Sequence, residues 1–205
     1  MYWFFYIARS VVWFLFTIIF DIEYVNVEKI PKREKGYIMA CNHTSYLDPL
    51  MTAFKNPKWV RYMAKSELTH IKGLGWLFRW LGIVPVERGS ADMSAIDRCA
   101  ELTREGYVLG IFPEGTRYPE GEPGKPKSGM ALIAKMTQAD VLPCAVRYQR
   151  PLGFRTKVTV TYGDLIPYEE LGLDEESHRA LKKATKRVWE DVIRLMGLEE
   201  KADEA

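Results

Sequence analysis

Short apolar runs alternate with amphipathic stretches after residue 22, and this alternation is typical of a single α/β domain. Four runs have the length and composition of strands, at residues 37–41, 107–112, 141–146 and 158–162. Residues 90–105 and 129–139 have helical periodicity, and one apolar stripe predicts a closing helix: Leu181, Ala184, Val188, Val192 and Leu195. We therefore expect one domain over residues 22–197, followed by an acidic tail at 198–205 that frays.

One predicted strand ends at residues that point to a loop and a helix start. The run 37–41 leads into Asn42 and His43, so this histidine is expected where a buried strand emerges into a loop. Asp48 and Pro49 then begin a helical pattern. We expect Asp48 at the N-cap and Pro49 at the first helical position.

The first 21 residues contain a long apolar run, residues 2–20, and we expect this segment to anchor the chain to a membrane. Residues 2–20 hold one basic residue, Arg9, and no acidic one. At about 1.5 Å per residue, such a helix can just cross a hydrocarbon core of roughly 30 Å. A polar stripe suits a helix lying in the interface instead: Tyr2, Tyr6, Arg9, Ser10, Trp13 and Thr17. A helix packed in a soluble core is a third alternative, and the signature of a cleaved signal peptide is absent.

The charge of the chain bears on its partners. With 29 Lys and Arg against 27 Asp and Glu, the net charge of +2 gives no reason to expect a nucleic acid. The stretch from Lys55 to Arg88 holds seven basic residues and two acidic ones, which suits an anionic partner or a solvated basic face. Basic residues also follow the apolar segment, which by the positive-inside tendency predicts a cytoplasmic globular part: Lys29, Lys32, Arg33 and Lys35.

The cysteines indicate neither a disulfide framework nor a zinc site. Cys41, Cys99 and Cys144 are odd in number, widely spaced and set among apolar neighbours. We expect reduced, buried thiols, as in a cytoplasmic environment.

His43 and Asp48 are candidates for general base catalysis. A carboxylate that accepts one imidazole N–H fixes the tautomer and leaves the other nitrogen free to take a proton from an alcohol. On the pair alone, a structural hydrogen bond is the commoner interpretation. Because no Gly-x-Ser-x-Gly motif or reactive cysteine accompanies the pair, the expected scheme is direct attack by an activated hydroxyl on a thioester.

A second loop, from Pro113 to Arg117, follows the predicted strand at 107–112 and carries charge. Glu114 and Arg117 either form an ion pair that closes this loop, or Arg117 is free to bind a phosphate through two hydrogen bonds. Arg88 and Lys127 are further cations that either converge on the same anion or lie on the surface as separate charges.

Together these residues resemble the glycerolipid acyltransferase family, which includes the lysophosphatidic acid (1-acylglycerol-3-phosphate) acyltransferases. The likeness lies in four blocks in the same order, over residues 42–48, 82–88, 112–117 and 141–146. The resemblance implies an α/β fold with a central mixed sheet flanked by helices and no metal. It also implies acyl-CoA or acyl-carrier protein as donor.

The same resemblance assigns roles to individual residues. His43 would be the general base and Asp48 its orienting partner. The expected substrate-binding residues are Arg88, Glu114, Gly115, Thr116, Arg117, Lys127 and Pro143. Pro143 is expected near the acyl donor, and the others near a glycerol phosphate acceptor.

The sequence leaves four functions open. The first is acyl transfer to 1-acylglycerol 3-phosphate in the membrane, which gives phosphatidic acid. The second keeps the same chemistry with another lysophospholipid, an acylated amino acid or a glycolipid as acceptor. The others are a non-catalytic, membrane-attached lipid-binding protein and a hydrolase.

Overall fold

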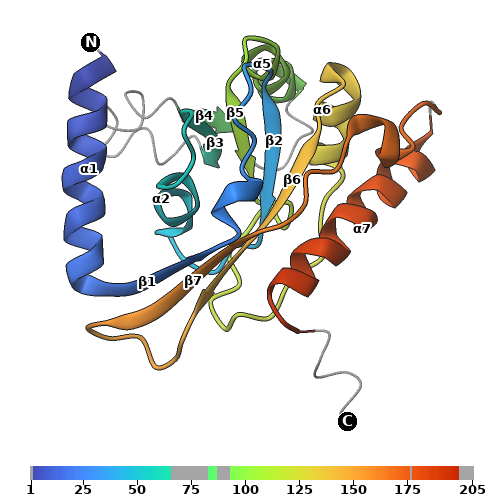
Figure 1. Cartoon of the computed structure of the whole chain (residues 1–205). Coiled ribbons are helices and arrows are strands. Elements are labelled where there is room, and N and C mark those ends of the chain that lie inside the picture. The colour runs from blue at the N-terminus through green and yellow to red at the C-terminus, as the bar shows by residue number, and fades with distance from the viewer. Residues whose placement is uncertain (1, 66–82, 87–92, 176, 199–205) are drawn as a thin grey trace.

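One mixed sheet organises the molecule. The computed structural model describes residues 2–65, 83–86, 93–175 and 177–198. Within these residues the sheet has the order β1-β7-β6-β2-β5-β3-β4 (Figure 1). The strands are β1 Phe20–Val25, β2 Tyr37–Cys41, β3 Val60–Lys65, β4 Val84–Val86, β5 Val108–Ile111, β6 Val141–Tyr148 and β7 Thr156–Tyr162. All neighbouring strands pair in parallel except β6 and β7, which are antiparallel.

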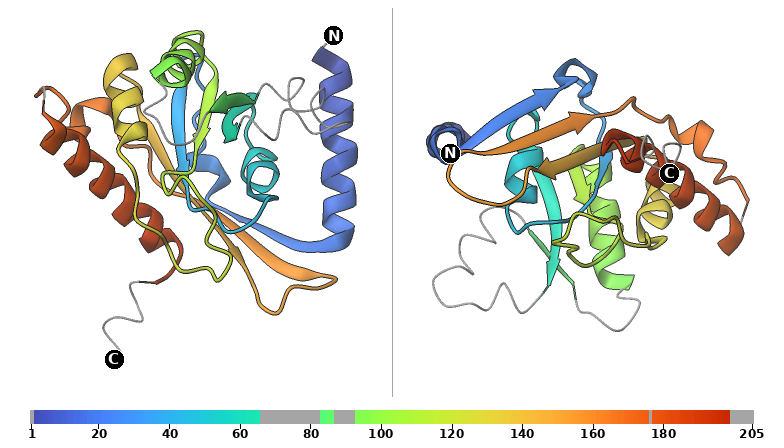
Figure 2. Two further views of the ribbon diagram at one scale, coloured as in Figure 1. Left: turned by 180° about the vertical axis from the view of Figure 1, so that it is seen from behind. Right: turned by 90° about the horizontal axis from the view of Figure 1, so that it is seen from below.

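Helices cover both faces of this sheet (Figure 2). They are α1 Tyr2–Ile19, α2 Asp48–Ala53, α5 Met93–Arg104, α6 Gly129–Thr137 and α7 His178–Leu195, with short 3-10 turns at Val27–Lys29 and Tyr168–Leu171. Because side chains alternate along a strand, β2 contributes to two cores. Ile38 and Ala40 pack with residues of α5, α6 and α7, whereas Tyr37, Met39 and Cys41 pack with residues of α2 and α1.

The parallel strands β2, β5 and β6 bring their carboxyl ends to one edge of the sheet. Cys41 is in register with Cys144 of β6, and Ala40 with Ile111 of β5. The residues that follow β2 and β5, and the last residues of β6, therefore meet at this edge. In open α/β sheets, ligands commonly bind outside the carboxyl ends of the strands.

Helix α1 occupies the amino-terminal segment, and its inner face joins the core beside α2. Val12, Trp13 and Phe16 pack against that core, and the rings of Phe16 and Phe54 meet edge to face at 5.5 Å. The membrane-spanning form of this segment is not found. Along the described residues, no helix combines the length and the apolar character that crossing a bilayer requires.

Most of the predicted elements are confirmed. The expected α/β fold with a mixed sheet flanked by helices is present, and the three cysteines are buried free thiols. Strands β1, β3 and β4 were not predicted, although residues 20–25 alternate in burial as an edge strand does. The closing helix buries Ala184, Val188 and Val192 as expected, and also Trp189. Of the predicted tail at 198–205, residues 199–205 lie outside the described part of the chain.

Candidate active site

The loop that follows β2 holds His43 next to Asp48. Nδ1 of His43 lies 2.8 Å from Oδ2 of Asp48, and the side chains are 18% and 0% exposed. Asn42 fixes the start of this loop, because its side-chain amide donates to the carbonyl of Val146 and accepts from the Val146 N–H at 2.9 and 2.8 Å. The Asn42 side chain thus continues the pairing of β2 with β6 by one more step.

Asp48 is fully buried, and its carboxylate is surrounded by donors. Besides His43, Oδ2 accepts from the backbone N–H groups of Thr44 and Ser45 at 2.7 and 2.8 Å. Oδ1 accepts from the hydroxyl of Tyr148 at 2.8 Å. Because backbone N–H groups can only donate, the carboxylate acts as the acceptor in this cluster. Nδ1 of His43 then carries the hydrogen toward Asp48, and Nε2 is left as a proton acceptor.

The position expected for Asp48 in its helix was wrong by one residue. Helix α2 begins at Asp48, the cap position is Leu47, and no side chain caps the helix. The reason is visible in the hydrogen bonds of Asp48. Its carboxylate points back into the loop toward Thr44 and Ser45, so it is not available to the N–H groups of its own helix.

Residues that follow β5 hold His43 from the opposite side. The imidazole stacks on the ring of Phe112, with centroids 4.1 Å apart and planes 16° from parallel. The backbone N–H of His43 donates to Oε2 of Glu114 at 2.6 Å, and its carbonyl accepts from the N–H of Tyr118 at 2.7 Å. The His43 backbone and ring are therefore both fixed by the segment after β5.

Glu114 is only 3% exposed, and it connects two loops. Its second oxygen, Oε1, accepts from the N–H of Gly124 at 2.8 Å. Burial raises the pKa of Glu114 to about 7, and the charge of Asp48 acts in the same direction. The two backbone hydrogen bonds, from Gly124 and His43, lower this pKa in part. The ion pair between Glu114 and Arg117 that the sequence left open is not formed, because Glu114 is turned inward to these N–H groups.

Arg117 and Lys127 lie around the same loop as Glu114. The guanidinium of Arg117 lies 3.3 Å above the ring of Tyr46, a residue of the His43 loop. The backbone N–H of Lys127 donates to the carbonyl of Pro113 at 2.8 Å. The ammonium end of Lys127 crosses Gly115, where an added Cβ would lie 3.1 Å from Nζ.

Gly115 itself has a φ of +67°, a left-handed conformation that favours glycine. Its neighbour Thr116 is exposed. The structure thus brings Glu114, Arg117 and Lys127 close to the His43 loop, and their roles in substrate binding stay predictions.

One of the expected site residues, Pro143, lies apart from this group. Pro143 is buried inside β6, where it is in register with Ala40 of β2, below the edge at which the His43 loop lies. Arg88 lies outside the described residues. In the described part of the chain, no cluster of three or more His, Cys, Asp or Glu side chains is placed to hold a metal ion.

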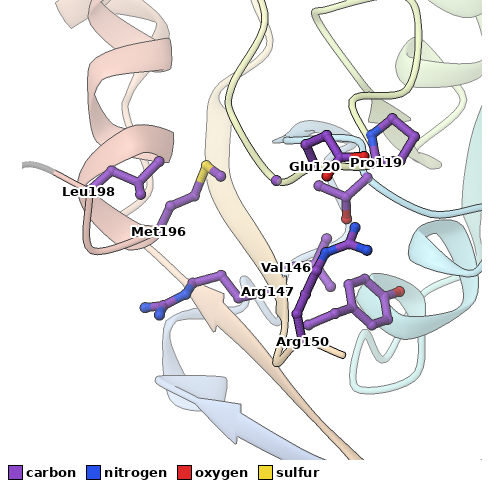
Figure 3. Close-up of a pocket in the computed structure, with 10 residues that line it drawn as sticks. Pro119, Glu120, Val146, Arg147, Arg150, Met196 and Leu198 are labelled. Atoms are coloured by element: carbon purple, nitrogen blue, oxygen red, sulfur yellow. The ribbon is translucent and has the colours of Figure 1, made fainter. Parts of the chain in front are cut away.

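A shallow cavity of about 120 Å³ adjoins the His43 loop beside Thr44 (Figure 3). It is lined by residues of the loop after β5, the end of β6 and the end of α7, among them Glu120, Arg147, Arg150 and Met196. In Figure 3 the side chain of Arg150 points toward Glu120, and that of Arg147 points toward the end of α7.

Tyr148 is the member of the site that the sequence did not indicate. It stands at the end of β6, and burial, followed by the charge of Asp48, holds its pKa well above the ordinary value. The hydroxyl therefore keeps its hydrogen and donates it to Asp48. The sequence hints at Tyr148 only through its place close to the end of a predicted strand. Because this strand, β6, is parallel to the strand that precedes His43, Tyr148 lies at the same edge of the sheet.

Comparison with known proteins assigns the chain to a family. The model of the family described as "Acyltransferase" matches residues 21–147, which run from β1 almost to the end of β6. This chain belongs to the acyltransferase family. The match covers the His43 loop, Asp48, the loop after β5 and most of β6, so the acyltransferase region and the candidate site coincide.

Named relatives and one solved structure support the same assignment. The 1-acyl-sn-glycerol-3-phosphate acyltransferase of Streptococcus pneumoniae is 32% identical over 81% of this chain and 63% of its own length. The Bacillus subtilis protein of the same name is 34% identical over 63% of each chain. A crystal structure of the 1-acyl-sn-glycerophosphate (LPA) acyltransferase PlsC from Thermotoga maritima superposes with a TM-score of 0.69 and 28% identity. It covers 90% of this chain and 73% of that one.

The chain spans 63% of the length of these two bacterial relatives. Its resemblance to the glycerolipid acyltransferases, noted in the sequence, is thus confirmed at the level of the family and of the α/β fold.

Proposed function

We propose that this acyltransferase moves a fatty acyl group from a thioester donor to the free hydroxyl of 1-acylglycerol 3-phosphate, giving phosphatidic acid. The observation that carries the proposal is the hydrogen bond between His43 Nδ1 and the buried carboxylate of Asp48. Both residues lie within the region that matches the acyltransferase family. The names of the bacterial and Thermotoga relatives support this acceptor.

In the proposed reaction His43 is the general base. Nε2 takes the proton of the acceptor hydroxyl as its oxygen attacks the thioester carbonyl, and Asp48 stabilises the imidazolium that results. The tetrahedral intermediate then collapses. Its carbon–sulfur bond breaks, the sulfur leaves as thiolate, and the imidazolium returns the proton to it. The products are an ester and a free thiol, with no acyl-enzyme and no need for a metal.

Arg117 and Lys127 are the proposed cations for the acceptor phosphate. Both lie on loops tied to His43 or Glu114, and an arginine matches a phosphate with two parallel hydrogen bonds. Gly115 supports this role because its missing side chain lets Lys127 pass over the loop. The donor, acyl-CoA or acyl-carrier protein, is proposed to reach the same edge of the sheet.

We further propose that the protein works at the cytoplasmic surface of a membrane, with α1 lying in the interface. The inner face of α1 packs on the core, while its outer face exposes apolar side chains: Val11, Phe14, Leu15, Ile18 and Ile19, each between 44% and 60% exposed. A helix that is apolar on its outer face as well gains from partial burial in lipid.

A competition assay tests the proposed acceptor and donor. Purified protein receives equal amounts of 1-acylglycerol 3-phosphate, lysophosphatidylcholine, lysophosphatidylglycerol and an acylated amino acid, with acyl-CoA or acyl-carrier protein in separate reactions. The products are identified by mass spectrometry. We expect phosphatidic acid as the main product with at least one donor. A preference for another acceptor would replace the lysophosphatidic acid assignment, and release of free fatty acid alone would indicate a hydrolase.

A further inference from the structure

The turn between β6 and β7 presents apolar side chains that the fold does not use. Leu152 is 56% exposed and Phe154 is 78% exposed. The turn is closed by its own residues, since the Gly153 N–H donates to Oγ1 of Thr156 at 2.6 Å and that hydroxyl donates back to the Gly153 carbonyl at 2.7 Å. Closure of the turn therefore does not require Leu152 or Phe154 to be buried.

Basic residues flank this apolar tip on both strands. Residues 147–157 contain Arg147, Arg150, Arg155 and Lys157 and no acidic residue. Arg155 and Lys157 pair with Asp21 and Glu23 of the neighbouring strand β1, at 3.7 and 2.9 Å. Arg147 and Arg150 are exposed and, within the described part of the chain, form no salt bridge. The side chain of Arg150 points toward Glu120 and that of Arg147 toward the end of α7 (Figure 3), so both charges lie at the base of the hairpin.

Arg155 joins this tip to the end of α1. Its backbone N–H donates to the carbonyl of Ile19 at 2.7 Å, and its guanidinium donates to the carbonyl of Thr17 at 2.6 Å. Arg155 has a φ of +61°, and this left-handed conformation is energetically unfavourable for any residue that has a side chain. The hydrogen bonds to the last carbonyls of α1 compensate for this cost. The tip lies beside the end of α1 in Figure 1 and in the right-hand view of Figure 2.

We propose that the β6–β7 hairpin, residues 147–157, is a second membrane contact that binds an anionic lipid surface. Leu152 and Phe154 enter the interface, and Arg147 and Arg150 bind lipid phosphates above it. An apolar tip framed by arginines has the composition of such a contact, because binding grows with buried apolar area and with attraction to anionic lipid. The exposed face of α1 continues into this tip through Arg155, so both contact one bilayer.

This contact also brings the lipid surface to the catalytic loop. Tyr148, which bonds Asp48, is the last residue of β6 before the tip. A hairpin held in the interface therefore places the sheet edge that carries His43 next to the layer in which a lysolipid acceptor resides. The proposal builds on the membrane association proposed for α1, but a different set of residues tests it.

Flotation of the full-length protein with vesicles measures the contact. Vesicles of phosphatidylcholine alone are compared with vesicles that also contain phosphatidylglycerol. The Leu152→Ser, Phe154→Ser double variant is expected to bind anionic vesicles less well by on the order of tenfold. The control is Met93→Ser, which removes an exposed apolar side chain from α5, at the far end of the molecule in Figure 1, and is expected to bind normally.

A charge variant and an α1 variant separate the possible outcomes. Arg147→Gln with Arg150→Gln is expected to remove most of the preference for anionic vesicles, whereas Lys182→Gln with Lys183→Gln on α7 retains it. Leu15→Ser with Ile18→Ser tests α1. Loss of binding in the α1 variant but not in the tip variant would overturn the hairpin contact and leave α1 in place. Turnover of a short-chain, water-soluble acceptor is expected to stay normal in the Leu152→Ser, Phe154→Ser variant.

A probe at the tip gives a readout that does not depend on the stability of these variants. Space is open around Gly153, where an added Cβ would meet no atom within 4 Å, and the native cysteines are buried. Gly153→Cys carrying an environment-sensitive fluorophore is expected to shift to the blue and brighten with anionic vesicles. The same label at Lys183→Cys on α7 is expected to stay unchanged. An unshifted label at Gly153→Cys, with the protein bound to the vesicles, would disprove insertion of the tip.

Discussion

The hydroxyl of Tyr148 donates a hydrogen bond to Oδ1 of Asp48 at 2.8 Å, although 100 positions separate the two residues in the chain. The other carboxylate oxygen, Oδ2, accepts from His43. Tyr148 thereby fixes the rotation of the carboxylate, and through it the orientation of the imidazole. In such a chain of hydrogen bonds, a residue that does not contact the substrate helps to orient the proposed base.

Removal of this hydroxyl in Tyr148→Phe is therefore expected to lower kcat by on the order of tenfold, with KM for the acceptor unchanged. A hydrogen bond to a charged group contributes roughly 1.5–3 kcal/mol, of which only the part that orients His43 appears in the rate. Steady-state kinetics measure the split between kcat and KM, and Tyr118→Phe is the control. A Tyr148→Phe enzyme with normal kcat would show that Asp48 does not need this donor.

Glu114 is expected to make the stability of the protein depend on pH. Its pKa of about 7 in the folded state lies above the ordinary value of 4.5, so the folded state disfavours the ionised form. The stabilising contribution is present in full below about pH 4.5 and is lost as the pH rises through about 7. At about 1.4 kcal/mol per pH unit of difference in pKa, stability falls by roughly 2 kcal/mol between pH 5 and pH 8.

Urea unfolding at pH 5 and pH 8 measures this dependence, and Glu114→Gln supplies the comparison. The variant is expected to lose stability at both pH values. A side-chain amide accepts only through its oxygen, so one of the two backbone N–H groups that bond Glu114 would lose its acceptor. The fall between the two pH values is expected to be smaller in the variant than in the wild type. An equal fall in both proteins would assign the pH dependence to other groups.

A side chain at position 115 is expected to destabilise the protein. The φ of +67° at Gly115 and the approach of Lys127 to 3.1 Å of an added Cβ both disfavour alanine. Gly115→Ala is expected to reduce the free energy of unfolding by about 1–2 kcal/mol, as a residue forced into the left-handed region does. Gly153→Ala, which has open space and an ordinary φ, is the matched control. Unchanged stability in Gly115→Ala would show that the loop relaxes.

Arg117 tests the recognition of the acceptor phosphate. Arg117→Ala is expected to raise KM for 1-acylglycerol 3-phosphate by on the order of tenfold or more, with a small effect on a neutral monoacylglycerol. Arg117→Lys retains the charge without the two parallel donors and is expected to fall between wild type and Arg117→Ala. If KM for both acceptors changed equally, Arg117 would serve the loop through its contact with Tyr46, and not the phosphate.

The sequence predicted those features that depend on local pattern. The strand before His43, the helix after Asp48 and the closing helix are visible as periodicity, and His43 and Asp48 are close because only five positions separate them. Strand β1 is hidden in the sequence because its first residue, Phe20, is also the last residue of the apolar run, although the residues that follow alternate between polar and apolar. Its parallel pairing with β7 joins segments more than a hundred residues apart, which periodicity does not encode.

The remaining site contacts are also long-range. Glu114 bonds the backbone N–H of His43 across 71 positions, and a carboxylate held by backbone groups leaves no pattern of partner residues in the sequence. For the same reason the sequence left an ion pair with Arg117 open. The N-cap role expected of Asp48 followed local preference, but the donors of the loop and Tyr148 determine its actual orientation.

The most direct test of the proposed mechanism is the turnover of His43→Ala with 1-acylglycerol 3-phosphate and a thioester donor, followed by mass spectrometry of phosphatidic acid. His178→Ala, which changes an exposed histidine at the start of α7, is the control. If His43 is the base, turnover falls by at least about a hundredfold, as loss of general base catalysis predicts, while thermal unfolding stays near that of the wild type. Phosphatidic acid formed at the wild-type rate by a folded His43→Ala protein would contradict the mechanism.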